Sequence, residues 1–370
     1  MTPSGFLNVR KPAGLTSHQC VGTIRRALDT QRQVGHGGTL DPMATGVLTV
    51  AVGRATRFLQ FLTTGKEYRG VIRLGVTTDS DDITGEMLTQ HAVPWVTEET
   101  VQRALQRYLD KGWGRKEEEV EQEERAIEDR ADERLTCCRF IGSIDQVPPR
   151  VSAIKRNGVR MYKLARANNE RVGRKREFSV TPRRVYIEHI DVEKFTQGDF
   201  PEVEIRVDCG GGTYIRSIAR ECGEALVVPP EQTDSSYELR NPAGDLCAGG
   251  TLTKLERTRS GIFTIAGSLS LDEIRAKAEK GDVPLQPIES MLQHLSFAEL
   301  PQHTVQRWLN GGVVAVPADE INCVKNKHYS LISGKPIRIY SRTSPGLLGV
   351  AQVDPQAQRN EFRLTKRLFI

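Results

Sequence analysis

The chain of 370 residues contains no apolar run as long as the roughly 18 residues that a membrane-spanning helix needs, which excludes a transmembrane protein. The first residues lack the basic and apolar regions of a secretory signal peptide, so we expect a cytoplasmic protein. The seven cysteines include no C-x-x-C pair, so neither a zinc site nor a redox motif is indicated. These absences leave a cytoplasmic globular protein without a bound metal as the expectation.

Charge is distributed unevenly along the chain. Residues 115–134 hold ten acidic and five basic side chains, a net of −5, which leaves +10 for the remainder of the +5 total. Residues 155–184 hold eleven lysines and arginines against two glutamates, a net of +9. A basic stripe of this kind fits a polyanion such as nucleic acid, and it fits a solvated charged surface about equally well.

Hydrophobic patterning predicts both strands and helices. Alternating or continuous apolar residues predict strands at residues 6–9, 47–52, 68–74 and 203–207. Apolar residues at helical spacing predict helices that start at Thr16 or Ser17, at about residue 97 and at Thr213. After about residue 290 the pattern changes to short strands and turns, which indicates a separate, small, β-rich domain.

The sequence GHGGTLDPMATG at residues 35–46 combines closely spaced glycines with an Asp-Pro pair. Glycine permits positive φ angles and the close approach of a ligand, and Pro42 stiffens the chain after Asp41, so the Asp41 carboxylate would be presented from a fixed position. No Gly-Lys-Ser/Thr follows and the spacing is not G-x-G-x-x-G, so neither type of nucleotide-binding loop is indicated. An aspartate in such a turn is more often structural than catalytic, and the loop alone does not decide.

Two further motifs carry candidate site residues. A strand leads through the three glycines at 210–212 into a helix whose first turn contains Arg216. A cation does not suit the start of a helix, and Arg216 lies off the apolar face, so a carboxylate or phosphate partner would explain it. The glycines fit either tight strand-to-helix packing or a phosphate cradle. Tyr68, between basic residues at the start of a strand, fits a core position or stacking on a nucleobase.

Taken in order, these motifs resemble one known family. The blocks that carry the resemblance are NVRKPAGLTS at 8–17, GHGGTLDPMATG, KEYRG at 66–70, QVPPRVSAIKRNGVRMYKLAR at 146–166 and CGGGTYIRSIARECGEAL at 209–226. They look like successive blocks of the bacterial TruB-type tRNA pseudouridine synthases, over roughly residues 5–265. Val151 stands where that family usually has an aromatic residue, and Glu256 where it usually has an arginine.

The resemblance implies a fold and a domain organisation. The expected class is α+β, with a central mixed, largely antiparallel β-sheet and flanking helices, the pseudouridine synthase fold. Residues 1–285 would form the catalytic domain, residues 112–136 a charged insertion within it, and residues 290–370 a small β-rich PUA-like RNA-binding domain.

The resemblance also implies roles for individual residues. The catalytic aspartate corresponds to Asp41, the active-site tyrosine to Tyr68, and the arginine that would face the aspartate and favour its charged form to Arg216. Contacts with the substrate RNA are expected from the following residues: Lys11, His36, Gly38, Lys155, Arg160 and, as an apolar pocket residue, Leu255.

The implied activity is that of an intramolecular isomerase, which converts a uridine in the T loop of tRNA (position 55) to pseudouridine. The N1–C1′ bond breaks and the base rejoins the ribose through C5 without redox change, so no cofactor and no metal are expected. The uridine must leave its stack to reach the carboxylate. The tRNA T stem-loop is the expected partner, and no protein partner is required.

Three other functions remain open. A guide-RNA-dependent dyskerin-type synthase shares the catalytic core and works with protein partners. An RNA-binding factor could keep the fold without the chemistry, although the intact Asp41 counts against it. A nucleotide-binding protein could use the glycines at 210–212, but the acidic residue expected on a following strand is missing.

Overall fold

The computed structural model describes residues 4–29, 33–110, 138–151, 155–156, 159–160, 180–233, 237–317, 321–322, 335–353 and 361–369. The chain divides into two units by its internal contacts. Unit 1 consists of Met1–Pro42, Gly46–Thr64 and Ser260–Ile370, and unit 2 of Met43–Thr45 and Gly65–Arg259. The predicted insertion at 112–136 lies outside the described residues. In the part that is described, no helix is long and apolar enough to cross a membrane.

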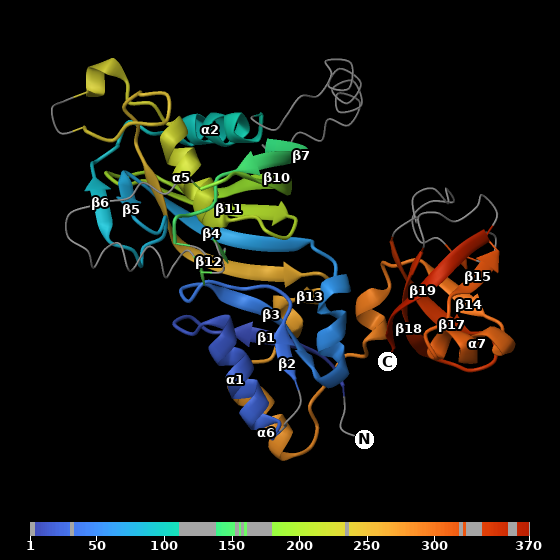
Figure 1. The fold of residues 1–370 in the computed structure, drawn as a ribbon. Helices are drawn as coiled ribbons and strands as arrows, with labels where there is room; N and C mark the ends of the chain where they lie inside the picture. The colour runs from blue at the N-terminus through green and yellow to red at the C-terminus, as the bar shows by residue number, and fades with distance from the viewer. Residues whose placement is uncertain are drawn as a thin grey trace. The chain divides into compact units, whose positions relative to one another are not determined.

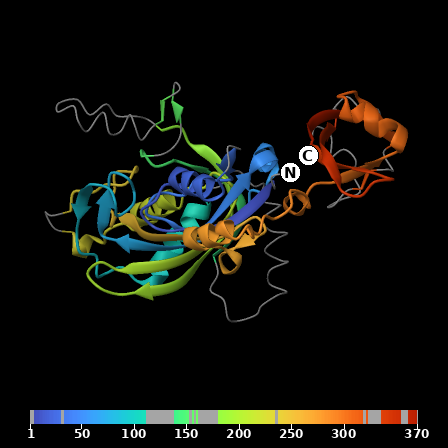
Figure 2. The ribbon, with the colours of Figure 1, turned by 90° about the horizontal axis from the view of Figure 1, so that it is seen from below.

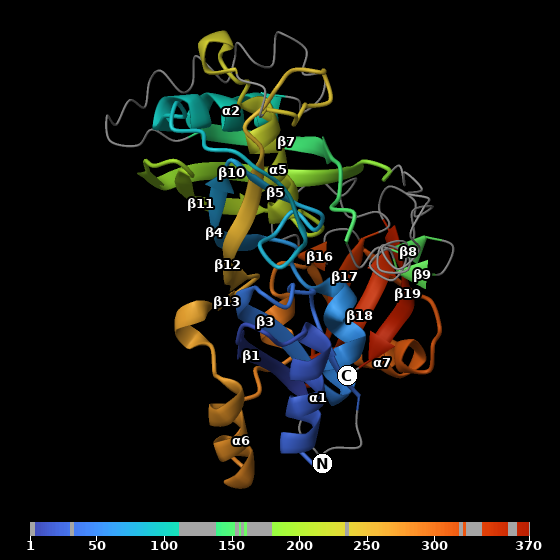
Figure 3. The same cartoon turned by 90° about the vertical axis from the view of Figure 1, so that its left-hand side faces the viewer.

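The N-terminal part of unit 1 is built around strand β3 (Thr45–Val52), of which all but the first residue is buried. Strands β1 (Gly5–Lys11) and β2 (Val34–His36) both pair antiparallel with β3. Helix α1 (Ser17–Ala27) begins after the N-cap Thr16, and its apolar face packs with these strands and with helix α6 (Leu271–Glu279). Figure 3 shows α1 and α6 next to each other. The strands and the helix start predicted for this region are confirmed.

The C-terminal part of unit 1 contains a six-stranded sheet with the order β15-β19-β18-β17-β14-β16. Its strands are β14 (Phe297–Leu300), β15 (Val314–Pro317), β16 (Ile321–Asn322), β17 (Pro336–Ser341), β18 (Leu347–Val353) and β19 (Glu361–Phe369). Helix α7 (Gln302–Leu309) places the fully buried Trp308 in the core of this sheet. The short β13 (Phe263–Thr264) and the 3₁₀ turns η1 (Gly53–Phe61), η3 (Ile265–Gly267) and η4 (Glu289–Leu292) complete the described elements of the unit. The predicted change to short strands after residue 290 is confirmed.

Unit 2 contains five long neighbouring strands in the order β12-β4-β11-β10-β7. They are β4 (Lys66–Leu74), β7 (Cys138–Gln146), β10 (Arg183–Thr196), β11 (Glu202–Cys209) and β12 (Gly250–Ser260). Strands β4, β11, β10 and β7 pair antiparallel, and Figure 2 shows β10 and β11 as long adjacent arrows. Together with the helices that flank it, this sheet confirms the predicted α+β class.

Two helices of unit 2 pack against each other and against the sheet (Figure 1). Helix α2 (Glu98–Asp110) contacts β7 and β10, and helix α5 (Ile215–Ala225) contacts β4. The apolar face predicted for α5 is buried, but the helix begins two residues later than the expected Thr213, because Gly212 has a φ of +93° and Tyr214 is still extended. Smaller elements are the hairpin of β5 (Val76–Thr78) with β6 (Met87–Gln90), the hairpin of β8 (Lys155–Arg156) with β9 (Val159–Arg160), and the turn η2 (Pro230–Gln232).

Candidate active site

Asp41 lies in an irregular loop between β2 and β3, and the peptide groups on both sides of it are held from the N-terminal segment. The Ser17 hydroxyl, which is buried, accepts a hydrogen bond from the Leu40 N–H (2.8 Å) and donates one to the Leu40 carbonyl (3.2 Å). On the other side, the Gly14 N–H donates to the Pro42 carbonyl (2.8 Å). Asp41 itself is half-buried. Its carboxylate therefore projects from a fixed backbone, the arrangement that a catalytic group requires.

The glycines of this loop are needed for two different reasons. A Cβ atom on Gly37 would lie 3.0 Å from Leu62 Cδ1, closer than ordinary packing allows. Gly38 has a φ of +144°, which disfavours any other residue. His36, at the end of β2, is half-buried and lies opposite Val50 of β3. The positive φ angle predicted for a glycine of this loop is therefore found at Gly38, whereas the absence of a side chain at Gly37 leaves room for Leu62.

Lys11 does not lie where the resemblance implied. Its side chain is fully buried, and its Nζ donates hydrogen bonds to the carbonyls of Pro12 (2.8 Å) and Pro42 (3.2 Å). An ammonium group in this position helps to hold the loop that carries Asp41. The expected contact with an RNA phosphate does not fit this conformation, because a phosphate cannot reach a side chain with no exposed surface.

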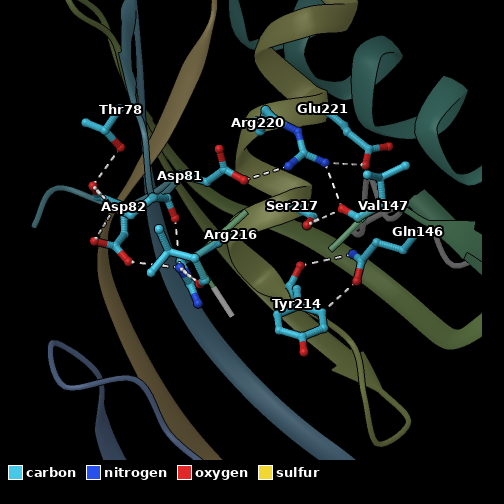
Figure 4. A network of polar contacts seen from close by, with 12 residues as sticks. Thr78, Asp81, Asp82, Gln146, Val147, Tyr214, Arg216, Ser217, Arg220 and Glu221 are labelled. Atoms are coloured by element: carbon cyan, nitrogen blue, oxygen red, sulfur yellow. Dashed lines mark hydrogen bonds and ion pairs between the residues drawn. The ribbon is translucent and has the colours of Figure 1, made fainter. Parts of the chain in front are cut away.

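In unit 2, Arg216 forms a buried ion pair with Asp82 (Figure 4). Arg216 Nη1 lies 3.3 Å from Asp82 Oδ2, and both side chains are about one-twentieth exposed (5% and 6%). The same nitrogen donates to the carbonyls of Ser80 (2.8 Å) and Val151 (3.1 Å). The Asp82 carboxylate also accepts hydrogen bonds from Ser80 Oγ and from Thr84 N–H. Of the two kinds of partner that the position of Arg216 suggested, a carboxylate is present, and it is that of Asp82.

A second, parallel pair lies one helical turn further along α5. Arg220 Nη1 donates to Asp81 Oδ2 at 2.6 Å, and a second guanidinium nitrogen contacts Glu221 (3.0 Å) and the carbonyl of Val147 (2.8 Å). Asp81 has a φ of +61°, a conformation that is rare outside glycine. Two adjacent aspartates therefore bind two arginines spaced four residues apart, and the loop between β5 and β6 is fixed to α5.

Tyr68 lies on β4 and is mostly buried (7% exposed) beside the fully buried Arg257 of β12. Arg257 Nη1 lies 3.5 Å from the Tyr68 hydroxyl, and the guanidinium is 6.0 Å from the ring centroid. Burial, and next the Arg257 charge, lower the pKa of the nearby Lys66 below its ordinary value of 10.5. Leu255, also on β12, is buried (8% exposed), and its role as an apolar pocket residue stays a prediction.

The predicted site residues fall into both units. Asp41, His36, Gly38 and Lys11 belong to unit 1, whereas Tyr68, Arg216 and Leu255 belong to unit 2. The pairing of Asp41 with Arg216 therefore stays a prediction. The backbones of Lys155 and Arg160 are cross-strand partners in the β8–β9 hairpin, and their side chains lie outside the described part.

Sequence patterning does not single out several residues that hold these candidates in place: Ser17, Asp81, Asp82, Gln146 and Arg257. One signal was available for the two aspartates. Arginines at 216 and 220 share a helix face, where like charges four residues apart repel each other unless each has an acidic partner. The remaining contacts depend on tertiary packing.

Comparison with known families matches this chain, over residues 25–114 and 111–215, to the N-terminal domain of the TruB family pseudouridylate synthases. The tRNA pseudouridine synthase B of Gloeobacter violaceus is 40% identical over 315 residues, which cover 85% of this chain and 87% of that protein. The chain belongs to the TruB family of pseudouridylate synthases. It is therefore an isomerase that converts uridine to pseudouridine.

Other relatives agree with this family. The tRNA pseudouridine synthase B of Gloeothece citriformis is 38% identical over 326 residues, 88% of this chain and 85% of that protein. Among solved structures, the crystal structure of a Cbf5–Nop10–Gar1 complex contains a chain with the same fold, at a TM-score of 0.60 and 22% identity, covering 99% of this TruB-family chain and 85% of that one.

Proposed function

We propose that this TruB-family enzyme isomerises a uridine in the T loop of tRNA, in the cytoplasm, with Asp41 as the catalytic carboxylate. The main support is that relatives sharing 38–40% identity over more than four-fifths of the chain are tRNA pseudouridine synthases by name. The local geometry also supports the role of Asp41, because this residue is half-buried in a loop whose backbone is held by hydrogen bonds before and after it. The PUA-like assignment of residues 290–370 belongs to the same proposal.

The reaction requires one bond to break and another to form without redox change. The N1–C1′ bond is cleaved, the uracil turns, and C5 bonds to C1′, while the proton of C5 leaves and N1 acquires one. An ionised Asp41 would act as the nucleophile, at C1′ or at C6 of the base. Arg216 would favour the charged form of the carboxylate, and Tyr68 would lie against the flipped base. His36 and Gly38 would contact the RNA beside it.

A guide-dependent reaction is the second candidate, because the structural neighbour belongs to a Cbf5 complex. That likeness, at 22% identity, concerns the fold. The closer sequence similarity to tRNA pseudouridine synthases favours an enzyme that recognises tRNA alone, without a protein partner.

Incubation of the purified protein with an unmodified tRNA transcript, followed by mapping of pseudouridine, tests this proposal. We expect the product in the T loop without added guide RNA or protein. Asp41→Asn should abolish turnover and leave tRNA binding within a few-fold, whereas Asp29→Asn, at an exposed position of the same unit, should change neither. Product that appears only with a guide RNA, or full activity of Asp41→Asn, would contradict the proposal.

A further inference from the structure

The start of helix α5 is held by a side chain from another strand. Tyr214, the residue before the helix, makes no capping hydrogen bond with its own side chain. Instead its N–H donates to Gln146 Oε1 (2.8 Å), and its carbonyl accepts from Gln146 Nε2 (3.0 Å). Gln146 is the last residue of β7 and is fully buried. One side-chain amide thus bonds to both main-chain polar groups of Tyr214, whose carbonyl also accepts from the N–H groups of Ser217 (3.1 Å) and Ile218 (3.4 Å).

The same short segment of chain is bound to α5 at three further points (Figure 4). The Val147 carbonyl accepts from Ser217 Oγ (2.8 Å) and from Arg220 Nη2 (2.8 Å), and the Val151 carbonyl accepts from Arg216 Nη1 (3.1 Å). These contacts place residues 146–151 along the polar side of the first two turns of the helix. Among the described contacts of this segment, those of the Gln146 side chain reach the backbone before the helix.

Arg216 follows Tyr214 by only two residues, so the position of its guanidinium depends on where the helix begins. Its Nη1 has to reach Asp82, the Ser80 carbonyl and the Val151 carbonyl at the same time. If the first turn unwinds, Arg216 loses its helical position, and a shift of the helical register by one residue would rotate its side chain by about 100° around the axis. Hydrogen bonds to a buried backbone group at the helix end prevent such a change.

We propose that Gln146 is a positioning residue for catalysis, which sets the register of the first turn of α5 and through it the placement of Arg216. This inference rests on the proposed function, because it assigns Arg216 to the reaction. Gln146 has no exposed surface, so it would act through the helix and not by contact with the substrate. Removing its two hydrogen bonds should therefore lower kcat much more than it raises KM for tRNA.

Two variants test this role. Gln146→Leu removes both hydrogen bonds at a similar volume, and we expect kcat to fall at least tenfold with KM within threefold. In Gln146→Glu, a protonated carboxylic acid can still donate to the Tyr214 carbonyl and accept from its N–H, but the carboxylate cannot donate. Because burial raises the pKa of such an acid, we expect the ratio of variant to wild-type kcat to fall at least tenfold as the pH rises from about 5.5 to about 8.5.

The control is Gln197→Glu, at an exposed position of the same unit. Gln197 also donates to backbone carbonyls in unit 2, those of Pro94 (2.7 Å) and Val96 (3.1 Å), and has no contact with α5 among its described interactions. Its kcat ratio should stay flat with pH. If Gln146→Leu does not fold, the pH profile of Gln146→Glu decides: a flat profile overturns the inference.

A double-mutant cycle separates positioning from general stability. If Gln146 acts through Arg216, then Gln146→Leu should cost less than twofold in kcat once Arg216 is replaced by alanine. If Gln146→Leu lowers kcat by the same factor with and without Arg216, the inference is overturned. Activity of the wild type and its loss in Asp41→Asn test the proposed function separately, so normal kcat in both Gln146 variants of an active enzyme overturns this inference alone.

Discussion

Asp82→Asn is expected to be the most informative single change in unit 2, because it removes one charge of a buried ion pair and keeps the shape. Breaking a buried pair on one side costs about 3–5 kcal/mol, since the other charge stays buried. Arg216 keeps two carbonyl acceptors, and an asparagine oxygen can still accept from the Thr84 N–H. We therefore expect the lower end, a loss of about 3 kcal/mol, or roughly 100-fold in the folding equilibrium.

The loss can be measured by urea unfolding, with hydrogen exchange of α5 peptides to locate it. The control is Glu204→Gln, which removes a charge from the pair with Lys194, whose two side chains are 46% and 64% exposed. Exposed pairs contribute about 0–1 kcal/mol, so this variant should stay close to the wild type. Equal, small losses in both variants would refute the assignment of Asp82 as the residue that compensates the buried charge of Arg216. A normal exchange rate in α5 of Asp82→Asn would refute it as well.

Two further predictions concern the other parts of the site. Ser17→Ala removes the partner of the Leu40 N–H and carbonyl beside Asp41, which should cost about 1–3 kcal/mol in stability and lower kcat. The control is Ser290→Ala, at an exposed hydroxyl of the same unit. Equal kcat values in both variants would contradict the role of Ser17. Lys66 has a lowered pKa in the folded chain, so the unfolded chain binds more protons just below pH 10.5, and the stability of the wild type should rise with pH in that window. Lys66→Met should remove this rise in stability, as measured by urea unfolding at several pH values. The free energy of unfolding of the variant should therefore increase relative to that of the wild type as the pH falls from 10.5. Parallel plots of unfolding free energy against pH for the two proteins would contradict the prediction.

Most elements of the fold follow from the local pattern of apolar and polar residues. Two features that the sequence did not predict correctly show the limit of such patterns. The first is the start of α5: Gly212 has a positive φ, and the backbone of Tyr214 bonds to Gln146, which lies 68 positions away, so local sequence alone does not decide where the helix begins. The second is Lys11, which was expected to contact the substrate RNA and is fully buried. The alternation along β1 places Leu7, Val9 and Lys11 on one face, and the first two are core residues, so the pattern itself indicated a buried lysine.

The candidate site was predictable only in part. Asp41 and Tyr68 stand in motifs with a recognisable order, whereas Asp82 stands in a stretch that composition assigns to an exposed polar loop. Its burial (4% exposed) results from partners more than 130 positions away. Charges are buried only when they are compensated, and the compensating residue cannot be located from a loop sequence alone.

The attachment of two distant loops to α5 has a consequence for how much the length of this chain can vary. The β5–β6 loop and residues 146–151 are both bonded to the helix. Helix α2 ends at Asp110 and strand β7 begins at Cys138, and these two elements pack against each other. Because of this packing, the positions of Asp110 and Cys138 do not depend on the number of residues between them. A change in that number should therefore leave the arginines of α5 with their neighbours.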